Sequence, residues 1–429
     1  MDAPQRSLMV NPRRYRFKME EQNVPQLRFP EFVDSLSNTR LGRISKFSKG
    51  KGISKSDVSS NGLDCIRYGE LYTTYAELID ETISKTDLNP NQLVISEEND
   101  LIIPASGETA VDIATASCVK RSGIALGGDI NIVKSEEDSR FLAYYLNGKK
   151  RNDIARYAQG SSVIHLYSTQ LKLIRLNLPT VKEQQKIASF LSAVDKKIEQ
   201  LTRKKKLLEE YKKGVMQKLF PQPGEQHPEL RFKDVNGEDF PDWEVKRLGE
   251  IADRITNKNT ENKYSFVLTN SATQGIVSQT DYFDKDIANQ NNLDGYYIVE
   301  QDDFVYNPRI SVHAPVGPIK RNTLETGVMS PLYSVFRFSE DSIDYFESFF
   351  ETTVWHKHMH SVANYGARHD RMNITVDDFM SLPIPFPNEK ERDKITYFLN
   401  ELNLKIHSSK KELGSMLVFK KGLLQQMFV

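Results

Sequence analysis

The fold is decided by residues 179–220, PTVKEQQKIASFLSAVDKKIEQLTRKKKLLEEYKKGVMQKLF. Apolar residues recur in this stretch every seven positions, at Ile187, Val194, Leu201, Leu208 and Val215. Such heptad spacing is typical of a helix that packs along one seam against another helix. Pro179 stands just before the pattern, where a proline ends a strand and permits a helix to follow. The stretch therefore predicts one long coiled-coil helix.

A second copy of this stretch ends the chain. Residues 387–429 follow the same pattern about 208 positions later. The matching residues are Glu183, Lys186-Ile187, Phe190-Leu191 and Lys212-Lys213-Gly214, which correspond to Glu391, Lys394-Ile395, Phe398-Leu399 and Lys420-Lys421-Gly422. The openings match too, since Leu27-Arg28-Phe29 corresponds to Leu230-Arg231-Phe232. A fixed period of this kind indicates an internal repeat, and only the residues between its ends differ.

The segments between the repeated ends have the mixed composition of an α+β fold, with strand-like runs, polar turns and helical stretches. We expect two globular domains joined by two long antiparallel coiled-coil helices, with a pseudo-twofold internal repeat. The expected segments are an N-terminal tail outside the repeat (1–24), the first globular domain (25–178), the first long helix (179–220), a linker (221–228), the second globular domain (229–386) and the second long helix (387–429).

Composition limits the classes of function. The chain of 429 residues has 58 basic and 58 acidic residues, but residues 1–220 carry a surplus of 8 positive charges and the remainder an equal deficit. Because phosphate binding depends on the local field, a neutral chain can still hold basic clefts. Cys65 and Cys118 are too few for a disulfide framework and lack zinc-site spacing. No apolar run approaches the roughly 18 residues of a membrane helix, so we expect a cytoplasmic protein without a membrane partner.

The repeated layout resembles a known family. It combines a variable domain, the opening Pro179-x-x-x-Glu183-Gln184-x-x-Ile187, a long helix, a linker and a second copy. This layout is similar to that of the specificity subunits of type I restriction-modification enzymes, over about residues 25–429. Local segments agree with the resemblance: Ser106-Gly107 and Leu126-Gly127-Gly128-Asp129 in the first domain, and Tyr306-Asn307-Pro308-Arg309, Gly317-Pro318-Ile319, Met329-Ser330-Pro331-Leu332-Tyr333 and Gly366-Ala367-Arg368 in the second.

The resemblance implies a division of labour between this chain and its partners. The globular domains would be target recognition domains, each of which recognises one half of an asymmetric two-part target in double-stranded DNA. The helices would dock two modification (methyltransferase) subunits and set the gap between the half-sites, and restriction subunits would add the motor and nuclease. The chain would have no catalytic residues, cofactor or metal of its own, because S-adenosylmethionine, ATP and magnesium belong to the partners. It contains neither a Gly-x-x-x-x-Gly-Lys-Ser/Thr motif nor an Asn-Pro-Pro-Tyr motif.

Candidate DNA-binding residues in the first domain lie in a lysine-rich segment and near turns. Within residues 46–55, the lysines stand among glycines and serines, which suits contact with the phosphate backbone. The alternative is a solvated surface loop. The candidates are Lys46, Lys49, Lys51, Lys55, Arg67, Tyr68, Arg121 and Ser161.

Candidates in the second domain combine amides with basic groups. Asn270, Ser271 and Gln274 belong to a polar segment whose amides suit recognition of adenine, and the alternative is an ordinary polar turn. Each basic candidate could instead form a surface salt bridge. The basic candidates are Arg309, His313, Lys320, Arg321, Arg368, His369 and Arg371.

Two other interpretations remain open. One is a coiled-coil scaffold that binds only proteins, which would have little reason to diverge only in its two globular domains. The other is a stand-alone DNA-modifying enzyme, which the missing motifs disfavour. His356 and His360 stand four apart, as zinc ligands can, but the sequence between them lacks the metalloprotease glutamate. We expect an amphipathic helix end there.

Overall fold

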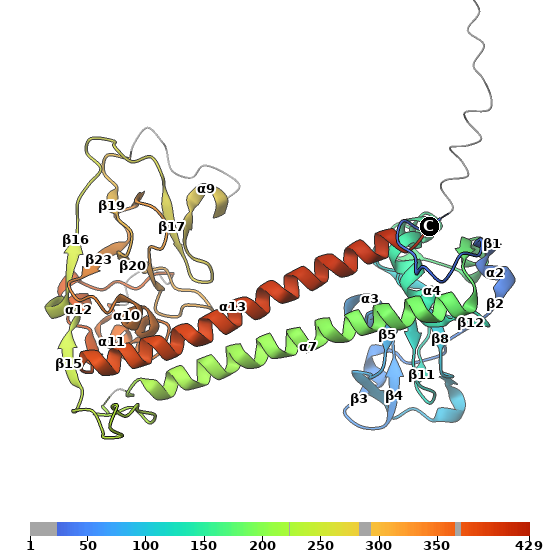
Figure 1. The fold of residues 1–429 in the computed structure, drawn as a ribbon, viewed down its shortest axis with the longest axis horizontal. Helices are drawn as coiled ribbons and strands as arrows, with labels where there is room; N and C mark the ends of the chain where they lie inside the picture. Colours follow the sequence, from blue (N-terminus) through green and yellow to red (C-terminus); the bar gives the residue numbers. More distant parts are fainter. Residues whose placement is uncertain (1–23, 223, 283–292, 365–369) are drawn as a thin grey trace, which may run out of the picture. The chain divides into compact units, whose positions relative to one another are not determined.

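The computed structural model describes residues 24–222, 224–282, 293–364 and 370–429. The chain forms two compact units. The first unit holds the described residues up to Thr202 together with Lys411–Val429, and the second unit holds Arg203–Lys410. Each unit therefore contains one globular domain, the start of one long helix and the end of the other. Figure 1 shows the long helices as α7, which spans Val181–Leu219, and α13, which spans Glu389–Gln426.

The globular part of the first unit consists of short strands and helices. Its strands are β1 (Ser37–Arg40), β2 (Ser45–Lys49), β3 (Val58–Ser59), β4 (Leu63–Ile66), β5 (Leu78–Ile79), β6 (Ser84–Thr86), β7 (Val94–Ile95), β8 (Asp100–Pro104), β9 (Ser106–Gly107), β10 (Ser117–Val119), β11 (Ala125–Leu126), β12 (Ile130–Ser135), β13 (Ile164–His165) and β14 (Arg175–Leu178). Its α-helices are α2 (Leu41–Ile44), α3 (Glu70–Thr73), α4 (Ser139–Tyr145), α5 (Arg151–Ala155) and α6 (Ser168–Leu171).

The globular part of the second unit is built in the same way. Its strands are β15 (Glu244–Arg247), β16 (Ala252–Ile255), β17 (Leu268–Ser271), β18 (Gly275–Ser278), β19 (Tyr297–Val299), β20 (Phe304–Tyr306), β21 (Ile319–Arg321), β22 (Gly327–Met329), β23 (Ser334–Phe338) and β24 (Pro383–Phe386). Its α-helices are α8 (Leu248–Ile251), α9 (Gln279–Tyr282), α10 (Ile343–Phe350), α11 (His356–Val362) and α12 (Val376–Met380).

The central strands of the two units share one topology and one register. The first unit has the order β2-β12-β8 and the second unit has β16-β23-β20. Leu101 lies opposite Val133 on β12, and Phe304, 203 positions after Leu101, lies opposite Phe336. Because a slip of one residue would turn every side chain to the other face of a sheet, this shared register makes residues 203 positions apart structurally equivalent along β8 and β20.

The turn before the central strand is also shared. Asp100 Oδ2 accepts the Glu97 N–H at 2.8 Å, and Asp303 Oδ2 accepts the Glu300 N–H at 2.7 Å. Asn99 before the first has a φ of 67°, a left-handed conformation that asparagine and aspartate tolerate better than most residues. Burial raises the pKa of both Asp100 and Asp303, so each carboxyl lies inside the protein as part of the turn.

Within each unit the two long helices pack in antiparallel order against the globular core. In the first unit, Ile187 and Leu191 near the start of α7 share a core with Leu423 and Met427 near the end of α13. In the second unit the roles are exchanged, since the start of α13 packs with the end of α7 through Leu399 and Leu219. The heptad residues Ile187, Val194, Leu201 and Val215 are buried, and Leu208 is half-buried, as expected for a helix that packs along a seam.

A buried ion pair fastens the opening segment of each unit to the start of its long helix. The Arg28 guanidinium donates to Glu183 on α7 at 2.8 and 2.7 Å, and the Arg231 guanidinium donates to Glu391 on α13 at 2.9 and 3.0 Å. The two glutamates are 1% and 0% exposed. Trp243 adds a third donor, because its Nε1 lies 2.9 Å from Glu391.

Phenylalanine closes the far end of each helix. Phe428 packs its ring 5.3 Å from Tyr145 in the first unit, and Phe220 packs 5.4 Å from Tyr345 in the second. These residues are the repeated phenylalanines that follow the Lys-Lys-Gly sequences. The repeat in the sequence therefore corresponds to a repeat of contacts, and the predicted α+β fold with two globular domains and two antiparallel coiled-coil helices is confirmed.

Candidate nucleic-acid interface

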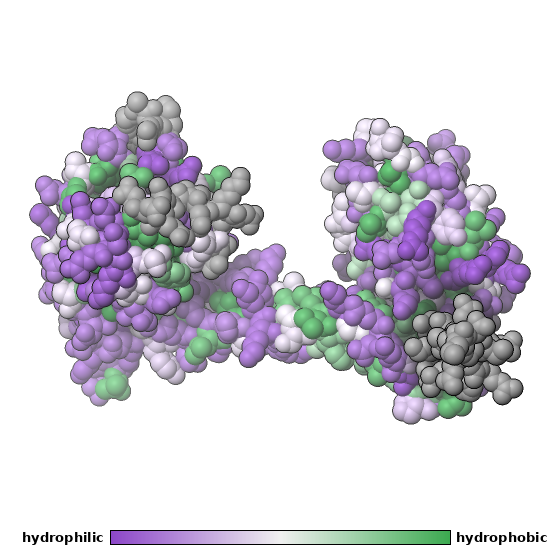
Figure 2. Space-filling model, turned by 90° about the horizontal axis from the view of Figure 1, so that it is seen from above, coloured by the Kyte–Doolittle hydropathy of each residue, from purple (hydrophilic) through white to green (hydrophobic). Residues whose placement is uncertain are grey.

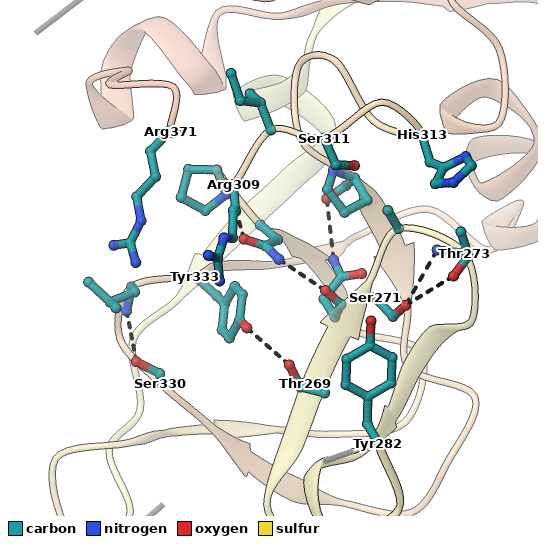
Figure 3. Close-up of a pocket in the computed structure, with 17 residues that line it drawn as sticks. Thr269, Ser271, Thr273, Tyr282, Arg309, Ser311, His313, Ser330, Tyr333 and Arg371 are labelled. Carbon is teal, nitrogen blue, oxygen red and sulfur yellow. Dashed lines mark hydrogen bonds between the residues drawn. The ribbon is translucent and has the colours of Figure 1, made fainter. Parts of the chain in front are cut away.

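A pocket of about 420 Å³ opens in the second unit where several loops meet. Its walls come from β17 and its turn, from the segment after β20, and from the loop between β22 and β23 (Figure 3). The sequence candidates Asn270, Ser271, Arg309, His313 and Arg371 all line this pocket. The full lining consists of residues 269–273, Tyr282, residues 307–311, His313, Pro318, Ser330, Leu332, Tyr333 and Arg371.

Arg309 and Arg371 lie opposite each other across an isolated antiparallel backbone bridge at one side of the pocket. The Met372 N–H donates to the Pro308 carbonyl at 2.9 Å, which keeps the two segments in register. Both guanidinium groups extend toward the loop that carries Ser330 and Tyr333 (Figure 3). The bridge therefore places the backbones of two arginines side by side, and both side chains line the same pocket.

Few side-chain N–H donors of these two arginines have a partner among the described residues. No ion pair joins the Arg309 side chain to any residue that the structure describes, and the carboxylate paired with Arg371, that of Asp370, lies 3.8 Å away. By contrast, Arg337 and Arg392 in the same unit are held by carboxylates. Guanidinium groups with free donors suit phosphate oxygens and the O6 and N7 acceptors of guanine.

Asn270 is placed differently from the prediction. It is 3% exposed, and its Nδ2 donates to the Val305 carbonyl at 2.7 Å and to the Pro318 carbonyl at 3.2 Å. Bidentate recognition of adenine needs a free amide N–H beside a free acceptor, so Asn270 cannot supply it in this arrangement. Its Oδ1 has no hydrogen-bond partner among the described residues, and this leaves one acceptor on a residue of the pocket wall.

The remaining candidates of the second unit are scattered. Ser271 Oγ accepts the N–H groups of Thr273 and Gln274 and so closes the turn, while the Gln274 side chain is exposed outside the pocket. Lys320 is half-buried on β21. Two further candidates, Arg368 and His369, lie outside the described residues.

Arg321 has a structural role. Its guanidinium forms ion pairs with three carboxylates, at 2.5 Å from Asp302, 2.6 Å from Asp344 and 3.2 Å from Glu347. The side chain is 19% exposed. Because these pairs use its donors, the sequence-based expectation that Arg321 contacts DNA is not supported by its surroundings.

The first unit has a comparable polar cluster at the equivalent place. His165 on β13 lies opposite Ser106 on β9, and Ser106 Oγ is 3.0 Å from His165 Nδ1. The His165 ring stacks on Tyr167 with centroids 6.0 Å apart, and Lys49 Nζ lies 5.6 Å from the centroid of the Tyr167 ring. This cluster connects Lys49, a predicted residue, to a histidine and a tyrosine that the prediction had omitted.

Ser161 stands on the hairpin that leads to this cluster. A bridge between Gln159 and His165 closes the hairpin. Gly160 has a φ of 126°, and a Cβ at this position would collide with the Val163 carbonyl. Only glycine therefore permits this turn, and Ser161 is exposed at its tip.

The other candidate lysines of the first unit are exposed, and no hydrogen bond or ion pair joins their side chains to the Ser106–His165 cluster in the described part of the chain. Lys46 lies on β2, and the backbone of Lys51 donates to the Leu126 carbonyl at 3.0 Å. Lys55 begins a short 3-10 turn. Lys51 and Lys55 belong to the segment that follows β2, and this segment packs against residues 126–128 through backbone hydrogen bonds.

Two predicted arginines of the first unit form ion pairs with carboxylates of the same unit. Arg67 donates to Glu70, which is 5% exposed, at 2.9 and 2.7 Å. Arg121 donates to Asp64 at 2.5 Å and to the Asp80 carbonyl at 3.0 Å. Tyr68, by contrast, is 37% exposed. The surroundings of both arginines indicate structural ion pairs, as those of Arg321 do.

The structure adds residues that the sequence-based selection missed, namely Ser106, His165 and Tyr167 in the first unit and Tyr333 in the second. For Ser106 the sequence holds a usable signal, since Asn99-Asp100 at the start of β8 corresponds to Asp302-Asp303 just before β20. Aligning the middle segments on these turns places Ser106 opposite Arg309 in the alignment. The long helices repeat after 208 residues, whereas these turns repeat after 203 residues. A comparison of the chain with itself at the helix period therefore misses this correspondence.

Metal-binding side chains are not clustered in the part of the chain that the structure describes. No group of three or more His, Cys, Asp or Glu side chains is placed there to hold a metal ion. His356 lies on α11 against Trp355, with ring centroids 4.6 Å apart, and burial, with His360 nearby, lowers its pKa. None of the described helices has the length and apolar content to cross a membrane.

Comparisons with known proteins agree with this architecture. Residues 36–210 match the family model of the type I restriction modification DNA specificity domain. The type I restriction enzyme MjaVIII specificity subunit of Methanocaldococcus jannaschii is 27% identical over 242 residues, which are 56% of this chain and 54% of that protein. The putative type I restriction enzyme MjaX specificity subunit of the same organism is 25% identical over 285 residues, 65% of this chain and 64% of that protein.

Solved structures share the fold over nearly the whole chain. The S subunit of a type I restriction-modification system from M. genitalium superposes with a TM-score of 0.58 at 15% identity, covering 95% of this chain and 99% of that one. A chain from a study of complex assembly and conformational transition of the type I R-M system superposes with a TM-score of 0.52 at 13% identity, covering 93% and 98%.

Two α+β domains carried on a duplicated helical frame define the S-subunit fold. Residues 36–210 match the type I restriction modification DNA specificity domain, and the named relatives to which this chain is similar are specificity subunits. The alignments cover only about half to two thirds of the length of the curated relatives.

Proposed function

We propose that this chain is the DNA-sequence-specificity subunit of a type I restriction-modification complex, in which each unit recognises one half of an asymmetric two-part target. The observation that carries the proposal is a frame repeated contact by contact, from Arg28–Glu183 and Arg231–Glu391 to the central strand register, with different polar side chains at the same place in each copy. A repeated frame suits partners used twice, and the differing polar groups suit two different half-sites.

Recognition in this proposal resides in loops on rigid strands. Exposed Lys49 and Ser161 near the Ser106–His165 cluster would contact the first half-site, and the pocket around Arg309 and Arg371 would contact the second. The exposed lysines Lys46, Lys51 and Lys55 would bind phosphates, whose contacts position a protein on DNA without specifying sequence. The neutral net charge is compatible with this because the cationic groups are gathered locally.

The long helices are the proposed docking surface for two modification subunits. Tyr211 on α7 and Phe419 on α13 occupy equivalent positions of the repeat, 208 residues apart, and are 54% and 48% exposed. Hydrophobic residues are visible among the polar ones on the surface of the long helices (Figure 2). Exposed aromatic residues are frequent anchors of protein interfaces. Restriction subunits, S-adenosylmethionine, ATP and magnesium would then join through the partners, in a cytoplasmic complex.

The test is co-expression of the chain with its modification subunits in a host without type I methylation, followed by genome-wide mapping of methylated adenines. We expect one motif with two different halves and a fixed gap. A host that expresses the modification subunits alone is the control and should lack the motif. A soluble complex that leaves the genome unmethylated would contradict the proposal and favour a scaffold that binds proteins only. Methylation by the purified chain alone would favour a stand-alone enzyme.

A further inference from the structure

The strand that leads to each polar cluster has the same course in both units. From the Asp100 and Asp303 turns, β8 and β20 run in the same register against β12 and β23. Ser106 lies six residues after Asp100, and Arg309 lies six residues after Asp303. The two residues are therefore equivalent in the fold, although serine and arginine are unrelated in size and charge.

The opposing segment is equivalent as well. The Leu166 N–H donates to the Ala105 carbonyl at 2.9 Å in the first unit, and the Met372 N–H donates to the Pro308 carbonyl at 2.9 Å in the second. One residue earlier, each segment forms the backbone bridge, with His165 opposite Ser106 and with Arg371 opposite Arg309. Each unit thus holds two side chains at one backbone bridge, which we call the reading bridge.

We infer that the reading bridge is the base-recognition position of both units. Its Arg309 and Arg371 would select guanine in one half-site, and its Ser106 and His165 would select a different base in the other. This inference rests on the proposed function and names the residues that distinguish the half-sites. It also assigns a chemical class to the target of the second unit, namely a half-site that contains a G·C pair.

Geometry and charge favour this assignment of the arginines. Guanine offers two acceptors, O6 and N7, on its major-groove edge, and the planar guanidinium fork matches them with two parallel hydrogen bonds. Arg309 has no ion pair within the described residues, and Arg371 is 32% exposed with its carboxylate partner 3.8 Å away. Base recognition also requires fixed positions, which backbone hydrogen bonds on both sides of the bridge provide.

The Ser106–His165 pair presents a different set of groups. Ser106 is 3% exposed and lies in hydrogen-bond distance of His165 Nδ1, so the serine orients the imidazole. The stacked Tyr167 ring restricts it further. With Nδ1 engaged by Ser106, the imidazole presents one nitrogen, Nε2, to a base, whereas a guanidinium presents a planar fork of donors. The two bridges therefore offer different patterns of groups to a base edge.

The experiment maps methylated adenines for complexes that contain single-residue variants. We expect Arg309→Ala to lower methylation of the wild-type motif by about 5- to 150-fold, the range of one good bidentate contact, and to relax one base position in one half only. Arg309→Lys should do nearly the same, since lysine keeps the charge but loses the fork. His165→Ala should relax a position in the other half. Arg254→Ala is the matched control, because Arg254 is an exposed arginine on β16 of the same unit, outside the pocket.

Each outcome decides a separate claim. If the wild-type complex leaves no two-part motif, the proposed function fails. If the wild-type motif is present and Arg309→Ala leaves it unchanged, the reading bridge is wrong while the proposed function stands. A uniform fall in methylation at an unchanged motif, restored by Arg309→Lys, would mean a phosphate contact and would also overturn the inference. Purification of the intact complex for each variant separates these results from failed folding.

Discussion

The reading bridge of the first unit carries Ser106 and His165, whereas that of the second carries Arg309 and Arg371, on backbones that share one register. The frames below the bridges differ far less, since both fasten an arginine to a buried glutamate and close with a phenylalanine. The contrast teaches that the fold constrains packing residues at both copies but leaves the bridge side chains free to differ. Stability and specificity should therefore be separable by mutation.

The largest effect should come from the buried glutamates. We expect Glu183→Ala or Glu391→Ala to lower the free energy of unfolding by about 3–5 kcal/mol, because each leaves an arginine that is only 14% or 17% exposed without its buried carboxylate partner. Glu391→Ala should lower the stability further, since it also leaves the Trp243 indole N–H without its acceptor. Urea unfolding followed by circular dichroism reports both units. Tryptophan fluorescence reports the second unit alone, where Trp243 and Trp355 both lie.

A matched control for these variants is Glu209→Ala. Glu209 pairs with Lys205 at 3.3 Å on the surface of α7, with 48% and 32% of the two side chains exposed. Exposed pairs of this kind contribute below about 0.5 kcal/mol. If Glu183→Ala cost no more than Glu209→Ala, the idea of a shared buried anchor would be lost.

A smaller effect is expected at the exposed aromatic pair on the helices. Tyr211→Ala and Phe419→Ala should each weaken the binding of one modification subunit by about 2 kcal/mol, the size of an interface hot spot. The other modification subunit should stay bound. Native mass spectrometry should then show complexes with one modification subunit in place of two. Lys206→Ala, an exposed change nearby, is the control. Equal loss of both copies from either single variant would contradict two equivalent docking sites.

The closing phenylalanines should be equivalent to each other. Phe428→Leu and Phe220→Leu remove ring contacts with two aromatic neighbours in each case. We expect a loss of about 1–2 kcal/mol from either, through lost aromatic pairing and imperfect refilling of the space. Thermal or urea unfolding of the two variants side by side measures this. If only one of the two variants lost stability, the two frames would differ more than their contacts indicate.

The smallest effect should be that of Arg121→Ala. The Arg121–Asp64 pair is partly exposed, at 47% and 24%, so its loss should cost below about 1 kcal/mol. Because the structure gives this arginine protein partners, the methylated motif should remain unchanged. Mapping the motif for this variant beside Arg309→Ala compares an arginine that is ion-paired within the protein with one that has no ion pair among the described residues. A changed motif would indicate that Arg121 does contact DNA.

Much of the fold follows from the sequence, and the reason is physical. The heptad residues Ile187 to Val215 and their repeat specify long helices that need a partner seam, and the repeated arginines and glutamates fix how each helix starts. Hydrophobic periodicity is a local property, so the sequence displays it directly. The predicted helix 179–220 differs from the observed α7 by only one or two residues at each end.

The site was predicted less completely, because exposure and pairing depend on residues distant in the chain. Arg67, Arg121 and Arg321 looked like free cations, but Glu70, Asp64 and Asp302 lie within hydrogen-bond distance in the folded chain. The sequence around His165 does not mark it as a site residue. His165 becomes a candidate only because it contacts Ser106, which is 59 residues away in the chain. Asn270 looked like a loop amide and is held by two backbone carbonyls.

The central claim is that one frame presents two different recognition surfaces, and a chain with two copies of one surface tests it most directly. The globular segment between β15 and β24 would be replaced by the segment between β1 and β14, with both long helices and both buried ion pairs retained. Co-expressed with the modification subunits, this chain should methylate a motif whose two halves are identical in sequence. An intact complex that still methylates the original asymmetric motif would contradict the account.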